Sequence, residues 1–121
     1  MSESIHRPWL AHYPKGVPAE IDLDEFPSIV ALLDNCFDRF RHRPAYTNMG
    51  RTISYGDLDQ MSRHFASYLV NELKLVKGDR IAMMMPNVMQ YPVAIAGALR
   101  AGLVVVNTNP MYTARELRHQ L

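Results

Sequence analysis

The run from residue 80 to residue 106 constrains the fold of this chain more than any other part. Two short apolar segments, residues 80–85 and 103–106, flank a segment that is almost wholly apolar between Val93 and Leu99. The outer segments show no alternation of polar and apolar residues, which is typical of strands covered on both faces. A strand, a helix and a parallel strand joined by a right-handed crossover are the simplest structure for this pattern. The sequence therefore predicts an α/β fold built on a parallel sheet.

Two pairs of residues have the spacing of a capping box, in which a hydroxyl and a carboxylate satisfy the first amides of a helix. Ser54 and Asp57 predict one helix, and its buried stripe is formed by Leu58, Met61, Phe65, Leu69 and Leu73. Thr113 and Glu116 predict another helix, which reaches the last residue after about two turns. We expect that the sequence is truncated there, because a helix without a C-terminal cap is an unusual end for a protein.

Prolines separate the first residues from the rest of the chain. Residues 1–27 contain four prolines, which predict an extended arm lying over a neighbouring part of the protein, anchored by Trp9, Leu10 and Tyr13. Residues 28–121 are then the incomplete start of a domain. Its first helix begins after Ser28 with one apolar face, formed by Ile29, Leu32, Leu33, Cys36, Phe37 and Phe40. A hairpin of residues 45–47 and 51–54 follows, turning at residues 48–50.

Charge and cysteine content narrow the classes of protein. The net charge is +1, so nucleic acid is not an expected partner. The densest basic run, Arg39, Arg41 and Arg43, is interpreted as a solvated helix end. Cys36 is the only cysteine, which favours a reducing cytoplasm and a structural thiol rather than a nucleophile. No apolar run reaches the ~20 residues of a membrane span, so any contact with the inner membrane is expected to be peripheral.

Complete catalytic or metal sites are not expected. The five histidines lack the spacing of metal ligands and are predicted to lie at the surface. Gly97 and Gly102 resemble a phosphate loop only weakly, since they fall at the C-terminal end of a helix, where the helix dipole repels anions. Gly97 is interpreted as a helix-packing residue and Gly102 as a cap. Asp57 is explained as a cap, and Asp59 as part of a solvated face.

Several segments together resemble the adenylate-forming enzymes. Residues 52–58 (TISYGDL) resemble the first core motif of this family, an aromatic and an acidic residue at a helix start. Residues 77–82 (KGDRIA), followed by Pro86 and Asn87, resemble the next strand and turn. Residues 98–110 (ALRAGLVVVNTNP) resemble the second core motif, continued by residues 113–117. Residues 9–21 and 107–113 are similar to those of bacterial long-chain fatty acyl-CoA synthetases.

The resemblance implies the N-terminal part of the large domain of such a ligase. The longer enzyme would take ATP, Mg²⁺, CoA and a long-chain fatty acid, and make acyl-CoA by way of an acyl-adenylate. The family's phosphate loop, its later acidic and arginine motifs and its C-terminal lysine have no counterpart in this sequence. We therefore assign no catalytic, cofactor-binding or metal residue, and expect scaffold that is inactive alone.

Other interpretations stay open. Whether Asn107, Asn109 or Tyr112 reaches a ligand is undecided, and a simple turn at Asn109–Pro110 is the alternative that we favour. The longer protein is alternatively a ligase for medium-chain, aryl or amino acids. A free-standing interaction module is a further alternative, although its apolar strands would need covered edges. We expect the isolated chain to self-associate, through these edges or by exchange of the arm, with a homodimer as one form.

Overall fold

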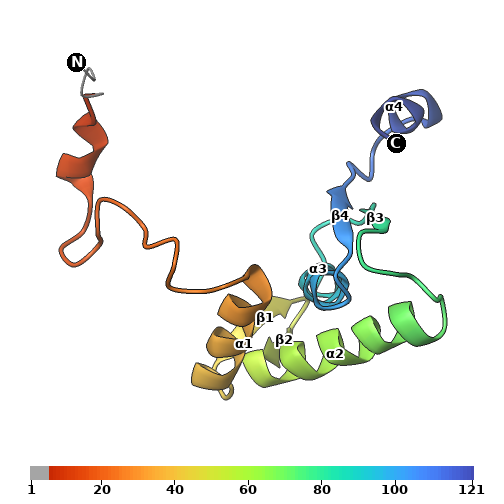
Figure 1. Ribbon diagram of the computed structural model, residues 1–121, viewed down its shortest axis with the longest axis horizontal. Helices are drawn as coiled ribbons and strands as arrows, with labels where there is room; N and C mark the ends of the chain where they lie inside the picture. The colour runs from red at the N-terminus through yellow and green to blue at the C-terminus, as the bar shows by residue number, and fades with distance from the viewer. Residues whose placement is uncertain (1–5) are drawn as a thin grey trace.

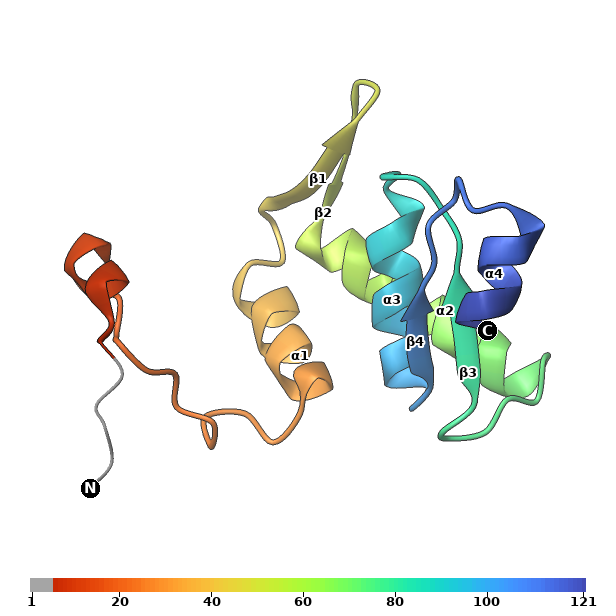
Figure 2. The same cartoon turned by 90° about the horizontal axis from the view of Figure 1, so that it is seen from above.

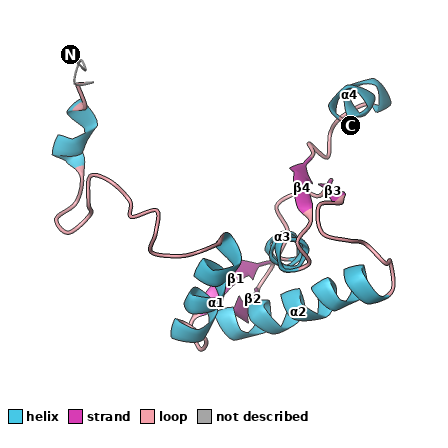
Figure 3. Cartoon of the chain, in the orientation of Figure 1, coloured by secondary structure: helices cyan, strands magenta, loops and turns pink. Residues whose placement is uncertain are grey.

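The computed structural model of the chain describes residues 6–121. Most of the described chain gathers into one group of helices and strands, while the N-terminal segment extends away from it (Figures 1 and 2). After a 3₁₀ helix, η1 (Pro8–His12), a long loop leads to the first α-helix (Figure 3). The elements that follow are α1 (Ile29–Arg39), β1 (Pro44–Asn48), β2 (Arg51–Ser54), α2 (Tyr55–Asn71), β3 (Arg80–Met83), α3 (Gln90–Arg100), β4 (Val104–Asn107) and α4 (Ala114–Gln120).

The predicted strand–helix–strand unit is confirmed. Strands β3 and β4 pair in parallel, with Arg80 opposite Val104 and Met83 opposite Asn107, and α3 connects them. Strand β3 ends at Met83 and strand β4 begins at Val104, so the predicted bounds of the two strands differ from the observed ones by one or two residues. Burial on both faces was wrong: Met84, just past β3, is 39% exposed and Val104 is 47% exposed. The reason is that α3 packs against one face of a sheet that has only two strands in the described chain.

The predicted hairpin is also confirmed. Strands β1 and β2 are antiparallel and turn through Met49 and Gly50 alone. Both turn residues have positive φ, +48° and +76°, as the common two-residue turn requires. The hydroxyls of Thr47 and Thr52 lie 2.8 Å apart across the pair. The helix that precedes the hairpin ends at Arg39, and Pro44 opens β1.

Helices α2 and α3 pack closely at Gly97. A Cβ atom at this position would lie 2.8 Å from Cδ1 of Phe65 and 2.9 Å from the carbonyl oxygen of Ser62. The interpretation of Gly97 as a helix-packing residue is therefore confirmed. Gly102, with φ of +76°, ends α3 in the left-handed conformation expected of a cap. Around this contact lies the first hydrophobic cluster, formed by Leu69, Met83, Ala94, Ala98 and Leu103.

Helix α1 belongs to a second hydrophobic cluster, formed by Phe37, Ile53, Leu58 and Ala96. Ser28 caps α1 by accepting a hydrogen bond from the amide of Ala31, as predicted. The apolar stripes of the first two helices were drawn too wide. Ile29, Leu32, Met61 and Leu73 are all exposed, and Leu73 lies beyond the end of α2 at Asn71.

The N-terminal segment differs from the expected arm. Residues 8–12 form a 3₁₀ helix with Pro8 in its first turn, a position that tolerates proline. Trp9 is 49% exposed and Tyr13 is 42% exposed, so the expected anchoring of this segment by buried aromatic rings is wrong. In Figures 1 and 2 the segment lies apart from the other elements of the described chain. The division into residues 1–27 and 28–121 stays a prediction.

Candidate functional site

The carboxyl edge of the β3–β4 sheet is the strongest candidate for a functional site. Because the strands are parallel, Met83 and Asn107 end at the same edge. Residues 84–89 leave β3 there, and residues 108–113 leave β4. In open α/β sheets, ligands bind outside the carboxyl ends of the strands.

Asn107 is a junction between three elements. The Tyr91 hydroxyl, on the first turn of α3, donates a hydrogen bond of 2.8 Å to Oδ1 of Asn107. The side-chain amide of Gln120, on the last turn of α4, donates a hydrogen bond of 2.8 Å to the backbone carbonyl of Asn107. Nothing in the spacing of the sequence pointed to either contact.

The loop after β4 begins with an ordered turn. The amide of Thr108, which is 4% exposed, donates to the carbonyl of Met83 at 3.1 Å and continues the ladder between the strands. Asn109 accepts at its side chain from the amide of Met111, at 3.0 Å, and at its carbonyl from the amide of Tyr112, at 3.1 Å. These are the bonds of a local asparagine turn, which confirms the turn predicted at Asn109.

An apolar hollow lies between the hairpin and the start of α3. Its volume is about 340 Å³, within the usual range for small-molecule sites. The Asn48 side chain donates to the carbonyl of Asn87 at 3.2 Å, which ties the end of β1 to the loop after β3. The lining residues are Tyr46, Thr47, Asn48, Asn87, Val88, Met89, Tyr91, Pro92 and Ile95.

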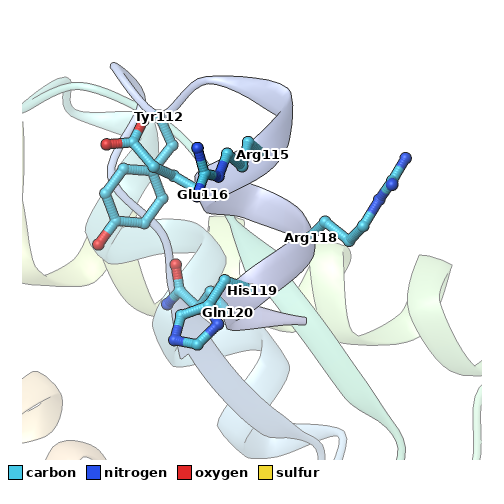
Figure 4. A pocket seen from close by; sticks show the side chains of 6 residues that line it. All are labelled: Tyr112, Arg115, Glu116, Arg118, His119 and Gln120. Carbon is cyan, nitrogen blue, oxygen red and sulfur yellow. The ribbon is translucent and has the colours of Figure 1, made fainter.

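A second, more open hollow of about 660 Å³ lies along α4 (Figure 4). Arg115, Arg118 and His119 contribute to its lining, but Arg118 points away from the other labelled side chains. The carboxylate of Glu116 is already engaged, because it accepts from the hydroxyl and the amide of Thr113. These bonds, that from the hydroxyl first, lower the pKa of Glu116. Because Glu116 caps α4 and Arg118 points away, the side chains around this hollow do not converge on a point.

Asp59 does not lie on a solvated face, and that prediction was wrong. Asp59 is 7% exposed, and its carboxylate lies 2.8 Å from the guanidinium of Arg63 and 2.7 Å from that of Arg100. The guanidinium of Arg100 also pairs with Asp34 at 2.7 Å and bonds the hydroxyl of Ser62 at 3.0 Å. This ion cluster joins α1, α2 and α3. Its one local signal was the spacing of Asp59 and Arg63 by four residues.

The remaining candidates lie where they were expected or carry no new site. All five histidines are exposed, as predicted. Cys36 is partly buried on α1. Among residues 6–121, no three His, Cys, Asp or Glu side chains are close enough together to hold a metal ion. Within the same residues, no helix combines the length and the apolar character needed to cross a membrane.

The βαβ unit and its hairpin define an α/β fold of the kind that opens the adenylate-forming enzymes. Residues 33–121 match the model of the family described as AMP-binding enzyme, and the chain belongs to this family. A long-chain-fatty-acid–CoA ligase of Salmonella typhimurium is 53% identical over 93% of this chain and 20% of its own length. A ligase of the same name from Yersinia pestis is 50% identical over 97% of this chain and 21% of its own length.

The chain thus spans about a fifth of the length of these relatives. Among solved structures, a benzoate CoA ligase from Burkholderia xenovorans is 32% identical, with a TM-score of 0.70 over 76% of this chain and 19% of its own. The N-terminal subdomain of NpsA from Klebsiella oxytoca shares the fold, with a TM-score of 0.74 over 78% of this chain, 24% of its own length and 24% identity. The fold predicted from the sequence is therefore confirmed.

Proposed function

We propose that this chain is scaffold in the N-terminal domain of a ligase that converts long-chain fatty acids to acyl-CoA. The observation that carries the proposal is the identity of 50–53% with ligases of that name over nearly the whole chain. A relative from Bacillus subtilis with the same name is 37% identical over 95% of the chain. The sequence identity with the benzoate ligase is lower, at 32%, which favours a long-chain acid over an aryl acid as the substrate.

The proposed reaction has two steps. The fatty carboxylate attacks the α-phosphate of ATP, so that an acyl-adenylate forms and pyrophosphate leaves. The thiol of CoA then attacks the acyl carbon, giving the thioester, and AMP leaves. A carboxylate needs this activation because its oxygen is a poor leaving group, and Mg²⁺ would stabilise the phosphoryl charge.

The part played by residues 6–121 would be to hold the edge of the sheet on which substrate-binding loops are built. None of the side chains described above combines a nucleophile with a base, or cations with a phosphate-sized cradle. The chain alone is therefore expected to be inactive. A cytoplasmic location, peripheral membrane contact and dimer formation stay predictions.

A hybrid enzyme tests this proposal. The corresponding residues of the Salmonella ligase are replaced by this chain, and pyrophosphate exchange and acyl-CoA formation are measured with palmitate and with benzoate. We expect exchange that depends on palmitate, with little on benzoate. A control hybrid carries the matching segment of the benzoate ligase. A folded hybrid without palmitate-dependent exchange would contradict the proposal, and so would acyl-CoA formation by the 121-residue chain alone.

A further inference from the structure

The hydroxyl of Tyr91 is held in a fixed place by the packing of its ring. The ring is partly buried against the first hydrophobic cluster, which contains Ala94 and Met83. A hydroxyl whose ring is already immobilised loses little further entropy when it donates a hydrogen bond. Its acceptor, 2.8 Å away, is the side chain of Asn107, which is otherwise exposed at the end of β4.

Asn107 therefore accepts two hydrogen bonds, one from a residue that precedes it in the chain and one from a residue that follows it. Tyr91 holds its side chain from α3, and Gln120 holds its carbonyl from the far end of α4. The loop of residues 108–113 therefore lies, along the chain, between Asn107 and the α4 residue Gln120 that bonds to it. Its own turn at Asn109 is local, so its position relative to the sheet depends on Asn107 and on the bond from Thr108 to Met83.

We propose that Tyr91 is a positioning residue for the ligation reaction, acting through Asn107 on the loop of residues 108–113. The inference rests on the proposed function, and names a residue that sets the geometry of the same site. The loop leaves the sheet at the carboxyl edge, where substrates of open α/β enzymes bind. Since small misplacements of groups near the chemistry lower rates strongly, the loop needs such a fixed point.

The experiment compares two tyrosine variants in the hybrid ligase. Tyr91→Phe removes the hydroxyl that bonds Asn107. Tyr68→Phe is the matched control, because Tyr68 on α2 lines neither hollow and the described residues give its hydroxyl no hydrogen bond. We expect Tyr91→Phe to raise KM for a substrate and to lower kcat/KM about five- to tenfold, as for the loss of one hydrogen bond. The control should change kcat/KM less than twofold, and the melting temperatures should stay close in both.

Hydrogen exchange in the same proteins gives a readout that needs no activity. Tyr91→Phe should speed amide exchange in residues 108–113, where the bonded amides are those of Thr108, Met111, Tyr112 and Thr113. Residues 101–103, bonded to the end of α3, should be unaffected. Gln120→Met removes the second bond to Asn107 and should speed exchange in the same loop. An inactive parent hybrid would refute the proposed function alone, because the exchange comparison still applies.

Three results would overturn the inference. The first is unchanged exchange in residues 108–113 in both variants. The second is faster exchange throughout the protein with a lower melting temperature, which describes general destabilisation. The third, in an active hybrid, is faster loop exchange with unchanged KM and kcat.

Discussion

Arg100 on α3 lies 2.7 Å from Asp59 on α2, and the two side chains keep only 8% and 10% of their exposure. The guanidinium also lies 2.7 Å from Asp34 on α1 and 5.4 Å from the centre of the Phe37 ring. One cation on α3 thus contacts both α1 and α2. Its charge is compensated twice, by one buried and one partly exposed carboxylate.

Replacing Asp59 is expected to destabilise the fold strongly. Asp59→Ala leaves the buried Arg100 with Asp34 as its remaining partner, and breaking a buried pair in this way costs about 3 kcal/mol. The measurement is the free energy of unfolding in urea. Asp38→Ala is the matched control, since Asp38 pairs with Arg41 at the surface and its loss should stay below about 0.5 kcal/mol. Equal effects of the two substitutions would show that the buried pair is not structurally important.

Gly97→Ala should be destabilising, although alanine is the better helix former. The new methyl group would meet Phe65 at 2.8 Å and the backbone oxygen of Ser62 at 2.9 Å. Forcing α2 and α3 apart should cost about 1–3 kcal/mol. A glycine with free space beside it would instead gain up to about 1 kcal/mol on replacement by alanine. Denaturant unfolding of the two proteins distinguishes these signs, and a gain would contradict the close packing.

The two capping boxes predict a loss of stability in acid. Hydrogen bonds from Ser54, that from its amide first, lower the pKa of Asp57 below its ordinary 3.8, and bonds from Thr113 lower the pKa of Glu116 below 4.5. The folded state therefore favours the charged carboxylates. Their contribution is complete above these ordinary values and is lost as the pH falls through the lowered ones.

The measurement is the melting temperature as a function of pH, taken from about pH 6 downward, where the ordinary carboxyl pKa values are passed. Asp57→Asn removes one titrating cap and should flatten the acid limb of the curve. Glu25→Gln, an exposed carboxyl outside either capping box, is the control. If both variants followed the original curve, the capping boxes would not cause its acid limb.

The edges of the β3–β4 sheet predict self-association of the 121-residue chain. Each strand pairs with one other in the described residues, and Val104 is 47% exposed on β4. Unpaired edges with apolar side chains are templates for further strands, whereas a charged residue blocks them. Sedimentation velocity should show association that rises with concentration and that Val104→Lys reduces. A chain that stays monomeric at all concentrations would contradict this expectation.

Features encoded by neighbouring residues were predicted well. Each capping box depends on residues three apart, and both boxes are present with reciprocal hydrogen bonds. The turn at Met49 and Gly50 and the turn at Asn109 are local for the same reason. Gly97 was identified because a glycine inside an apolar helix usually has a packing reason.

Contacts between distant residues were missed. Asp59 and Arg100 are 41 positions apart, so only the packing of α2 on α3 brings them together. The same is true at the candidate site, where Tyr91 is 16 positions from Asn107. Both Asp59 and Asn107 are ordinary polar residues in sequence. Their roles arise from the crossover geometry, which pattern and propensity do not specify in enough detail.

The fold also decides which methionines of the chain oxidation would reach first, and one of them is at the tip of the hairpin. Met49 is 99% exposed at the tip, while Met83 on β3 is 3% exposed in the first hydrophobic cluster. Sulfoxide formation makes a methionine polar, which is harmless in solvent and disruptive in a core. Mild peroxide should thus modify Met49 at the tip and Met111, which is 86% exposed in the loop after β4, while the folded chain shields the thioether of Met83.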